Sequence, residues 1–221
     1  MRKLTGAVFQ SIDGVMQAPG GPDEDPSGGF SLGGWSFPFW DESMGTSPFE
    51  KLIESEYDLL LGKRTYDIFA AYWPNNRDVP IGERFQRINK YVLTHSHEPL
   101  AWENSSKLTG DTADVIATLK RSEGRDLLIQ GSSTLYPPLL AAGLIDRLLL
   151  MIFPVMLGKG TSIFDGWADS GSFRLVDHAL SDKGVIFATY EPAGPVQVGS
   201  FATKEPSEAE IARREKLQAE A

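Results

Sequence analysis

The sequence predicts an α/β fold with a mainly parallel central sheet. Short apolar runs typical of buried strands alternate along the chain with segments of helical hydrophobic period, as in proteins built from βαβ units. The 221 residues are 41% hydrophobic and 23% charged, which is typical of one globular domain with its own core. Two later apolar runs flank the turn Asp182-Lys183-Gly184, so we expect the sheet to end in an antiparallel hairpin.

The first half of the chain is expected to supply three strands and three helices. An apolar strand over residues 4–12 ends at the turn pair Asp13-Gly14. The sequence Ser47-Pro48-Phe49-Glu50 provides an N-cap, a first-turn proline and an acidic residue for a helix over residues 48–56. Further strands are expected over residues 57–61 and 90–94, and further helices over residues 63–72 and 81–89.

The second half continues this alternation. Asp111 and Gly124 bound a helix with one apolar face, because Asp is a good N-cap and Gly a good C-terminal residue. A second helix is expected to have Thr134 as its N-cap and to end at Gly143. Two prolines then fall in its first turn, where backbone amide groups have no helical partner. Strands are expected over residues 126–130, 148–157, 173–180 and 185–190.

The predicted domain covers residues 1–191, and residues 192–221 form a tail of different character. Prolines interrupt the beginning of the tail, and a charged helix is expected over residues 207–221. Ile211 and Leu217 are the large apolar residues of that helix, too few to cover a core. We therefore expect the tail to be solvated or to contact a partner.

Charge and composition exclude several classes of protein. The net charge of −9 disfavours a nucleic-acid partner, which is held by neutralising phosphates. The absence of cysteine excludes disulfides, thiolate zinc sites and iron–sulfur ligation. The N-terminus lacks an apolar signal core, and the apolar run over residues 148–157 is shorter than the about 20 residues of a membrane helix. We expect a cytoplasmic protein that binds neither nucleic acid nor membrane.

The segment over residues 14–40 shows no periodic element. It holds seven glycines, four prolines and five aromatic residues. A loop of this length in a compact domain is usually a functional lid or is disordered. Because disordered segments are poor in aromatic residues, the composition favours a lid.

Two segments repeat one local design, in which a buried strand passes through a glycine into hydroxyl-bearing residues that begin a helix. They are residues 59–65 and 128–134. Glycine allows a ligand to approach the backbone, and a helix N-terminus attracts an anion. Lys63 and Arg64 would supply positive charge for a ribose 2′-phosphate and so favour NADPH over NADH. Both segments are equally compatible with ordinary strand-to-helix turns.

Five short motifs follow one another in a characteristic order. They are SIDG at residues 11–14, GKRTY at 62–66, QGSSTL at 130–135, GLIDRL at 143–148 and PVMLGKGTSIF at 154–164. This order resembles the dihydrofolate-reductase-like superfamily. Within it, the chain is most similar to the reductase (C-terminal) domain of the bacterial riboflavin-biosynthesis deaminase/reductase and its stand-alone relatives. The resemblance covers residues 2–191.

The resemblance implies a three-layer dihydrofolate-reductase-like fold that binds NADPH across the ends of the strands. Gly62, Lys63, Arg64, Thr65, Thr94 and Ser96 would hold the adenosine side of the cofactor. Gln130, Gly131, Ser132, Ser133, Thr134 and Leu135 would hold its pyrophosphate. The chain departs from the family in having Gly131-Ser132 where two glycines are common, and Arg147 where an acidic residue is common. It also lacks the zinc-binding cysteines of the deaminase half, so it could reduce a riboflavin precursor but not deaminate one.

A small heterocyclic substrate would lie beyond the carboxyl ends of the strands, near Asp13 and Phe153. Its flat ring would stack on Trp35 or Phe37, although both aromatic residues are equally suited to packing the loop on the core. Reduction of a C=N bond also needs a proton. Asp13 is the first candidate donor, with its role as an acceptor in the Asp-Gly turn as the alternative. Asp41, Glu42, Glu50 and water are further candidates.

These observations predict an NADPH-dependent reductase of a small heterocycle. The specific form that the resemblance implies is 5-amino-6-(5-phosphoribosylamino)uracil reductase. Reduction of dihydrofolate or another pterin, and nucleotide binding without turnover, are the alternatives. We expect no metal site, because His95 and His97 have no obvious third ligand. We expect a homodimer, with the tail as a possible clasp for the partner.

Overall fold

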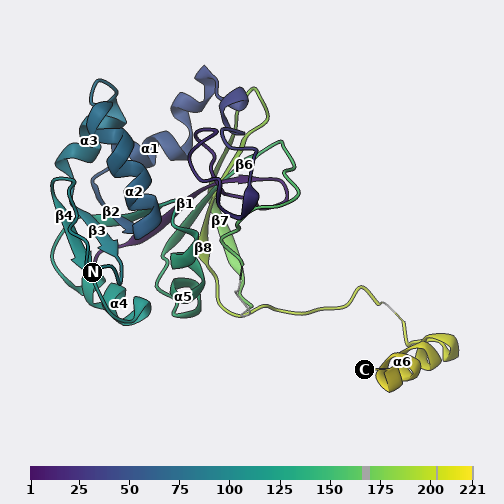
Figure 1. Ribbon diagram of the computed structural model, residues 1–221. Coiled ribbons are helices and arrows are strands. Elements are labelled where there is room, and N and C mark those ends of the chain that lie inside the picture. Colours follow the sequence, from purple (N-terminus) through teal and green to yellow (C-terminus); the bar gives the residue numbers. More distant parts are fainter. Residues whose placement is uncertain (166–169, 203, 221) are drawn as a thin grey trace.

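The computed structural model describes residues 1–165, 170–202 and 204–220 of the chain. In this part, eight strands form one sheet in the order β4-β3-β2-β5-β1-β6-β8-β7 (Figure 1). Strands β1 to β6 are joined by parallel pairings, whereas β8 pairs antiparallel with both β6 and β7. The predicted α/β fold, with a mainly parallel sheet and a C-terminal hairpin, is confirmed.

The strands agree with the predicted ones except for one additional edge strand and an earlier end of β6. Strand β4 was not predicted, because its sequence Ser-Ser-Lys-Leu is polar and an edge strand leaves side chains exposed. Strand β6 ends at Phe153, short of the predicted residue 157, because Pro154 has no amide hydrogen for the ladder. The strands are β1 Leu4–Ser11, β2 Tyr57–Gly62, β3 Lys90–Leu93, β4 Ser105–Leu108, β5 Asp126–Gln130, β6 Arg147–Phe153, β7 Phe173–Leu180 and β8 Ile186–Pro192.

The predicted helices are present, with one correction. The N-cap predicted at Thr134 is wrong, because a 3₁₀ turn over Ser133–Leu135 precedes the helix and no described side chain caps either element. The two prolines do lie at the beginning of the helix, where a missing amide hydrogen costs nothing. The helices are α1 Pro48–Glu54, α2 Lys63–Tyr72, α3 Pro80–Arg87, α4 Thr112–Arg121, α5 Tyr136–Ala141 and α6 Glu208–Glu220.

Helices cover both faces of the sheet and complete a three-layer structure. Helices α1, α2 and α3 bury Phe49, Tyr66 and Phe85 against one face (Figure 1). Helices α4 and α5 bury Ile116 and Leu139 against the other. Since the strands β1 to β6 run in one direction, their carboxyl ends lie along a single edge of the sheet, where the predicted site residues gather.

The loop over residues 14–40 lies against the core. Its regular structure consists of two 3₁₀ turns, Ser27–Gly29 and Phe37–Phe39, with no longer helix or strand, as expected. Phe30 and Trp35 belong to the same buried cluster as the sheet residues beneath them. The loop is therefore an ordered cover over one part of the sheet face.

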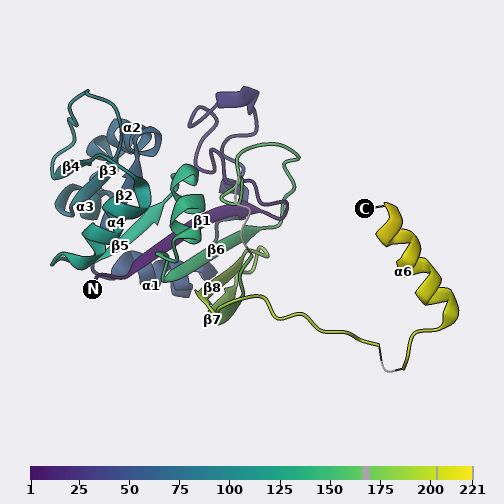
Figure 2. The same cartoon turned by 90° about the horizontal axis from the view of Figure 1, so that it is seen from below.

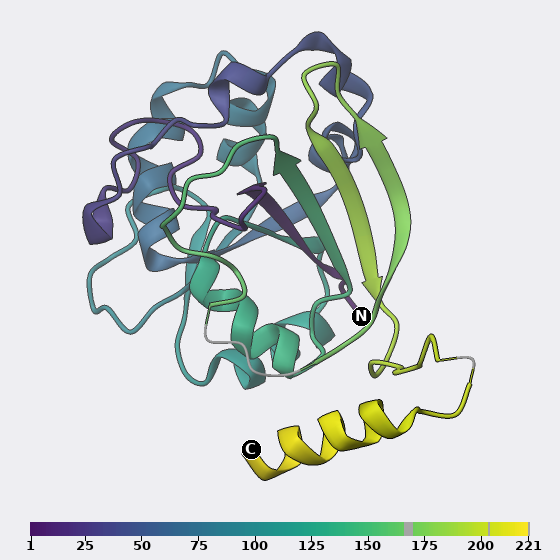
Figure 3. The ribbon, with the colours of Figure 1, turned by 90° about the vertical axis from the view of Figure 1, so that its right-hand side faces the viewer.

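The chain leaves the domain after β8. Residues 193–202 run in an extended conformation away from the domain, and Figures 1, 2 and 3 show α6 separated from the sheet and its helices. Ser207 Oγ accepts a hydrogen bond from the Glu210 amide at 3.3 Å, as expected of an N-cap. The predicted last residue of this helix, Ala221, lies outside the described residues.

Candidate active site

The two glycine turns lie side by side and are hydrogen-bonded to each other. Strands β2 and β5 are parallel neighbours, so their carboxyl ends coincide. The Gly62 amide donates to Ser132 Oγ at 2.9 Å, and the Ser132 amide donates to Thr65 Oγ1 at 3.0 Å. Two segments about 70 residues apart in the sequence thus form one continuous surface of backbone and hydroxyl groups.

The backbone of the second turn requires its glycine. Gly131 has a φ of +74°, and a Cβ atom there would lie 3.0 Å from Thr65 Cγ2. Ser132 is also left-handed, with a φ of +57°, a conformation that costs a non-glycine residue about 1 kcal/mol or more. A second glycine at this position would avoid that cost. Here the Ser132 hydroxyl offsets it by accepting the hydrogen bond from Gly62.

Both turns present hydrogen-bonding groups without protein partners. No described side chain caps the beginning of α2 or of the turn over Ser133–Leu135, so their first amide groups can bind an anion. Gln130 Oε1 is buried and has no hydrogen-bond partner in the described part of the protein. Buried polar atoms without partners are rare in native structures, and this one lies where strand β5 ends.

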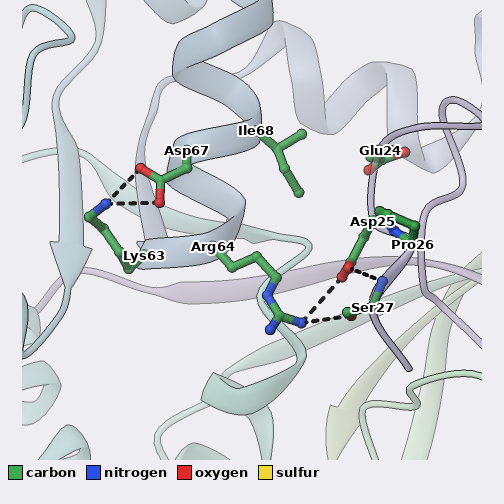
Figure 4. A pocket seen from close by; sticks show the side chains of 8 residues that line it. All are labelled: Glu24, Asp25, Pro26, Ser27, Lys63, Arg64, Asp67 and Ile68. Atoms are coloured by element: carbon green, nitrogen blue, oxygen red, sulfur yellow. Dashed lines mark hydrogen bonds and ion pairs between the residues drawn. The ribbon is translucent and has the colours of Figure 1, made fainter. Parts of the chain in front are cut away.

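The cations beside the first turn are paired with carboxylates. Lys63 Nζ lies 2.8 Å from Asp67 Oδ1 and 3.4 Å from Glu98 Oε2. The hydrogen bond to Asp67 is the main cause of a raised Lys63 pKa. Arg64 Nη1 lies 3.4 Å from Asp25 Oδ2 and 3.1 Å from Ser27 Oγ, both in the long loop (Figure 4).

An open groove of about 580 Å³ lies between α2 and the long loop, and its lining includes Lys63, Arg64, Asp67, Asp25 and Ser27 (Figure 4). Asp25 is held there by the loop itself, since its backbone carbonyl accepts from Gln17 Nε2 at 3.0 Å. Its side chain also accepts from the Ser27 amide at 3.1 Å. The groove thus brings Lys63 and Arg64 together with a preorganised acidic segment that the sequence analysis did not single out.

Thr94 and Ser96 lie at the end of β3, the neighbour of β2. The Thr94 amide donates to the Leu108 carbonyl at 3.1 Å, and Thr94 Oγ1 accepts from the Ser96 amide at 3.0 Å. Since β3, β2 and β5 are consecutive in the sheet, the structure brings all three predicted cofactor segments to one edge. Their role in binding a cofactor stays a prediction.

Asp13 ties the end of β1 to the segment after β6. Its carboxylate accepts from Ser11 Oγ at 2.6 Å, the Gly158 amide at 2.7 Å and the Leu157 amide at 3.1 Å. These hydrogen bonds, the one from Ser11 foremost, lower the pKa of Asp13 from 3.8 to about 2. A carboxyl group held in its ionised form is poorly suited to donate a proton near neutral pH.

Asp41 is held in a similar way. It caps the 3₁₀ turn Glu42–Thr46 by accepting from Ser43, and it accepts from the Lys183 amide at 3.1 Å. The Ser43 side-chain hydrogen bond is the main cause of its lowered pKa. Glu50 is different: it is partly buried in α1, and its carboxylate makes no hydrogen bond or ion pair in the described part of the chain.

The three aromatic residues predicted to contact substrate have different surroundings. Phe153 is fully buried, and Trp35 packs edge-on against it with ring centres 5.4 Å apart and donates to the Gln17 carbonyl. In this conformation Trp35 therefore packs the loop on the core. Phe37 is 78% exposed and free to meet a ligand.

A cluster of aromatic residues surrounds Phe153. The sequence analysis did not predict this cluster. Phe9 of β1 stacks on Phe153 at 5.8 Å and meets Phe49 of α1 edge-on at 5.3 Å. Trp40, which is 38% exposed, lies 5.8 Å from Phe9. The five aromatic residues of the loop could have indicated such a cluster, but their contacts with β1 and α1 depend on the fold.

Histidine residues near the end of β3 were considered as metal ligands in the sequence. His95 and His97 follow β3, and no group of three or more His, Cys, Asp or Glu side chains suited to a metal ion occurs in the described ranges. None of the helices in those ranges combines the length and apolar composition needed to cross a membrane.

The chain is similar in sequence to known proteins. Residues 2–187 match the RibD C-terminal domain family. The uncharacterized protein YyaP of Bacillus subtilis (strain 168) is 24% identical over 155 residues, which are 68% of this chain and 80% of YyaP.

Solved structures show the same fold. A crystal structure from Shewanella sp. PV-4, described as a candidate riboflavin biosynthesis protein, has a TM-score of 0.62 and 22% identity. The match covers 87% of this chain and 99% of that one. Dihydrofolate reductase from Enterococcus faecalis, complexed with NADP(H), has a TM-score of 0.54 and 18% identity over 86% of this chain and 96% of its own. The dihydrofolate-reductase-like fold is confirmed.

Proposed function

Since the chain belongs to the RibD C-terminal domain family, a family of NADPH-dependent reductases, we propose that it reduces a small heterocyclic substrate with NADPH. The substrate class that the family favours is a ribosylaminopyrimidine of the kind reduced by 5-amino-6-(5-phosphoribosylamino)uracil reductase. The observation that carries the proposal is the pair of glycine turns joined by hydrogen bonds at the carboxyl ends of β2 and β5.

The residues present fit a phosphorylated dinucleotide. The left-handed backbone at Gly131 leaves no room for a side chain, and the amide groups after Gly62 and Ser132 remain available for phosphate oxygens. The unpartnered Gln130 Oε1 would accept a hydrogen bond from the ligand. When bound, NADPH supplies the hydride that reduces the substrate.

Lys63 and Arg64 would bind the 2′-phosphate that distinguishes NADPH from NADH. Both cations already contact carboxylates, so a phosphate would replace Asp25 at Arg64 rather than fill an empty position. This exchange would couple cofactor binding to the position of the long loop, because Asp25 is fixed to Gln17 and Ser27.

Among Asp13, Asp41 and Glu50, we assign to Glu50 the proton that reduction of a C=N bond requires, because its carboxylate alone makes no hydrogen bond or ion pair in the described residues. It follows Phe49, whose ring contacts Phe9 beside the carboxyl ends of β1 and β6. Asp13 and Asp41 are held ionised by structural hydrogen bonds, whereas Glu50 is partly buried and makes no such bond in the described residues. Asp13 would instead position the segment after β6.

Two measurements test the proposal. Calorimetric titration should show binding of NADPH that is tighter than binding of NADH, and absence of binding of both cofactors would overturn the reductase proposal. Loss of nicotinamide absorbance should then be seen with a ribosylaminopyrimidine. Loss with dihydrofolate instead would identify a pterin reductase, and cofactor binding with no turnover on either substrate would identify a binding protein.

The proton donor is tested with two matched variants. Glu50→Gln removes the proton but keeps the size of the side chain, and it should lower turnover by about 100-fold or more with little change in NADPH affinity. The chemical step should be faster in the Asp13→Asn variant than in the Glu50→Gln variant. If it is slower in the Asp13→Asn variant, Asp13 is the proton donor.

A further inference from the structure

The segment over residues 193–202, here called the arm, exposes an unusual amount of apolar surface. Its sequence, AGPVQVGSFA, contains no charged residue. Val198 is 93% exposed, Phe201 is completely exposed and Val196 is half-exposed. Apolar side chains gathered on a short extended segment are typical of a surface that another protein covers.

A groove with an uncharged lining, as far as the described residues show, begins where the arm leaves the domain. It has a volume of about 420 Å³ and lies between the end of α5 and the beginning of β7. None of the ten lining residues that the structure describes is charged, and Leu140, Ile145 and Phe173 provide apolar surface. The arm and the described lining of the groove are complementary, since neither contains a charge that would be buried without a partner.

The arm is directed away from its own groove. The Ala193 amide donates to the Ser172 carbonyl, and the Ser172 amide donates to the Gly194 carbonyl, both at 2.8 Å. Ser172 Oγ also donates to the Pro195 carbonyl at 3.1 Å. These bonds hold the first residues of the arm at the groove rim, and the chain then extends outward (Figures 1 and 3).

We propose that two copies of this chain associate by exchanging arms, with Val196, Val198 and Phe201 of each arm in the groove of the other copy. Because the arm begins at the groove rim, a two-fold axis near the groove would place each arm opposite the partner groove. The same patch then serves both subunits, as a closed dimer requires.

The neighbouring surface suits such a dimer. Strand β7 is the last strand of the sheet, and it exposes Leu175, Val176 and Leu180, the last of them by 70%. An apolar edge strand left in water invites association with other chains. A partner docked at the groove would extend over this hairpin.

Helix α6 is not needed for the exchange. Its Arg213 and Arg214 pair with Glu210, and Lys216 pairs with Glu220, so these charges are balanced within the helix. Ile211 and Leu217 are only about half-exposed. The helix therefore serves as the matched control for substitutions in the arm.

Disulfide trapping tests the exchange directly, because the chain contains no cysteine. One full-length chain would carry Ala141→Cys in the groove, and a second, larger tagged chain would carry Val198→Cys in the arm. After mixing and mild oxidation, a mixed disulfide dimer should predominate over the two same-chain dimers. A tagged Leu217→Cys chain should give several-fold less of the mixed dimer.

A doubly substituted chain distinguishes exchange of arms between two copies from an arm that folds back onto the groove of its own copy. If Ala141→Cys and Val198→Cys in one chain give cross-linked dimers, exchange is supported. A cross-linked monomer would overturn the proposal, because the arm would then occupy its own groove. An equal yield with the Leu217→Cys control would also overturn it, since the contact would then be a random collision.

Light scattering of full-length protein provides the independent readout. The unaltered chain should have twice the 24.3 kDa mass of one copy. Val198→Asp with Phe201→Asp should shift the mass towards one copy, because two charges would enter an apolar groove. Ile211→Asp with Leu217→Asp should leave the mass unchanged. A monomeric unaltered chain, or equal effects of the two pairs, would contradict arm exchange.

Discussion

The loop over residues 14–40 and the arm over residues 193–202 are both irregular and rich in glycine or proline. They differ in whether their large apolar side chains are buried or exposed. The loop buries Trp35 and Phe30 in the core of its own domain. The arm leaves Val198 and Phe201 in water. Composition alone therefore does not determine what an irregular segment does. Its apolar side chains are buried only where a matching protein surface lies within reach of the segment.

The largest expected effect is on the stability that the loop contributes. Trp35→Ala should lower the free energy of unfolding by about 3–5 kcal/mol, because it removes a buried ring that packs against Phe153. Phe201→Ala, measured in dilute protein, should change the free energy of unfolding by less than about 0.5 kcal/mol. Urea unfolding monitored by circular dichroism measures both, and similar losses would mean that the arm also packs on its own domain.

The next effect concerns the contact of the loop with α2. Arg64→Ala should weaken NADPH binding by about tenfold, because one charge-assisted hydrogen bond to a phosphate is lost. NADH binding should hardly change. Arg121→Ala, which removes an exposed arginine of α4 that donates to Thr118, is the control. Equal weakening for both cofactors would place the 2′-phosphate elsewhere.

A smaller effect of opposite sign is expected from the loop carboxylate. Asp25→Asn should strengthen NADPH binding by about two- to threefold, since the exposed pair that Asp25 forms with Arg64 no longer competes with the phosphate. In an Arg64→Ala background the same substitution should have no effect on affinity. Calorimetric titration of the four chains measures the coupling, and additive effects would rule out competition at Arg64.

The last expected effect is a pH dependence of stability at Asp13, the residue directly before the loop. The folded pKa of Asp13 is about 2, below its ordinary value of 3.8, so its stabilisation is present above about pH 4 and is lost as the pH falls towards 2. Asp13→Asn should therefore be less stable than the unaltered chain at pH 5 and approach it near pH 2. Asp23→Asn, at an exposed loop position, is the control. Parallel stability curves for all three chains would contradict this account.

The strands and helices were largely predictable because burial requires a regular spacing of apolar residues. Strand β4 escaped prediction since it is polar and lies at the edge of the sheet. The N-cap at Thr134 was mistaken because the chain inserts a 3₁₀ turn whose geometry depends on the left-handed Ser132. Ser132 adopts that conformation while bonded to Gly62 and Thr65, two partners that the local sequence does not reveal.

The candidate site was predictable in its backbone segments and less so in its side chains. Glycine turns at the ends of buried strands can be identified by residue order, and parallel pairing brings them together. Whether a carboxylate is free or bound cannot be identified in that way. Asp13 accepts hydrogen bonds from residues 157 and 158, whereas Glu50 has no such partner in the described residues.

By itself, the sequence determined the α/β class, the two glycine turns and the family resemblance, because these depend on local periodicity and on the order of short motifs. Only the tertiary structure decided that Asp25 pairs with Arg64, that Trp35 is buried, and that the arm extends away from a groove whose described lining carries no charge. The physical reason is that ion pairing, burial and groove shape depend on distances between residues far apart in the chain, which are fixed only when the sheet assembles.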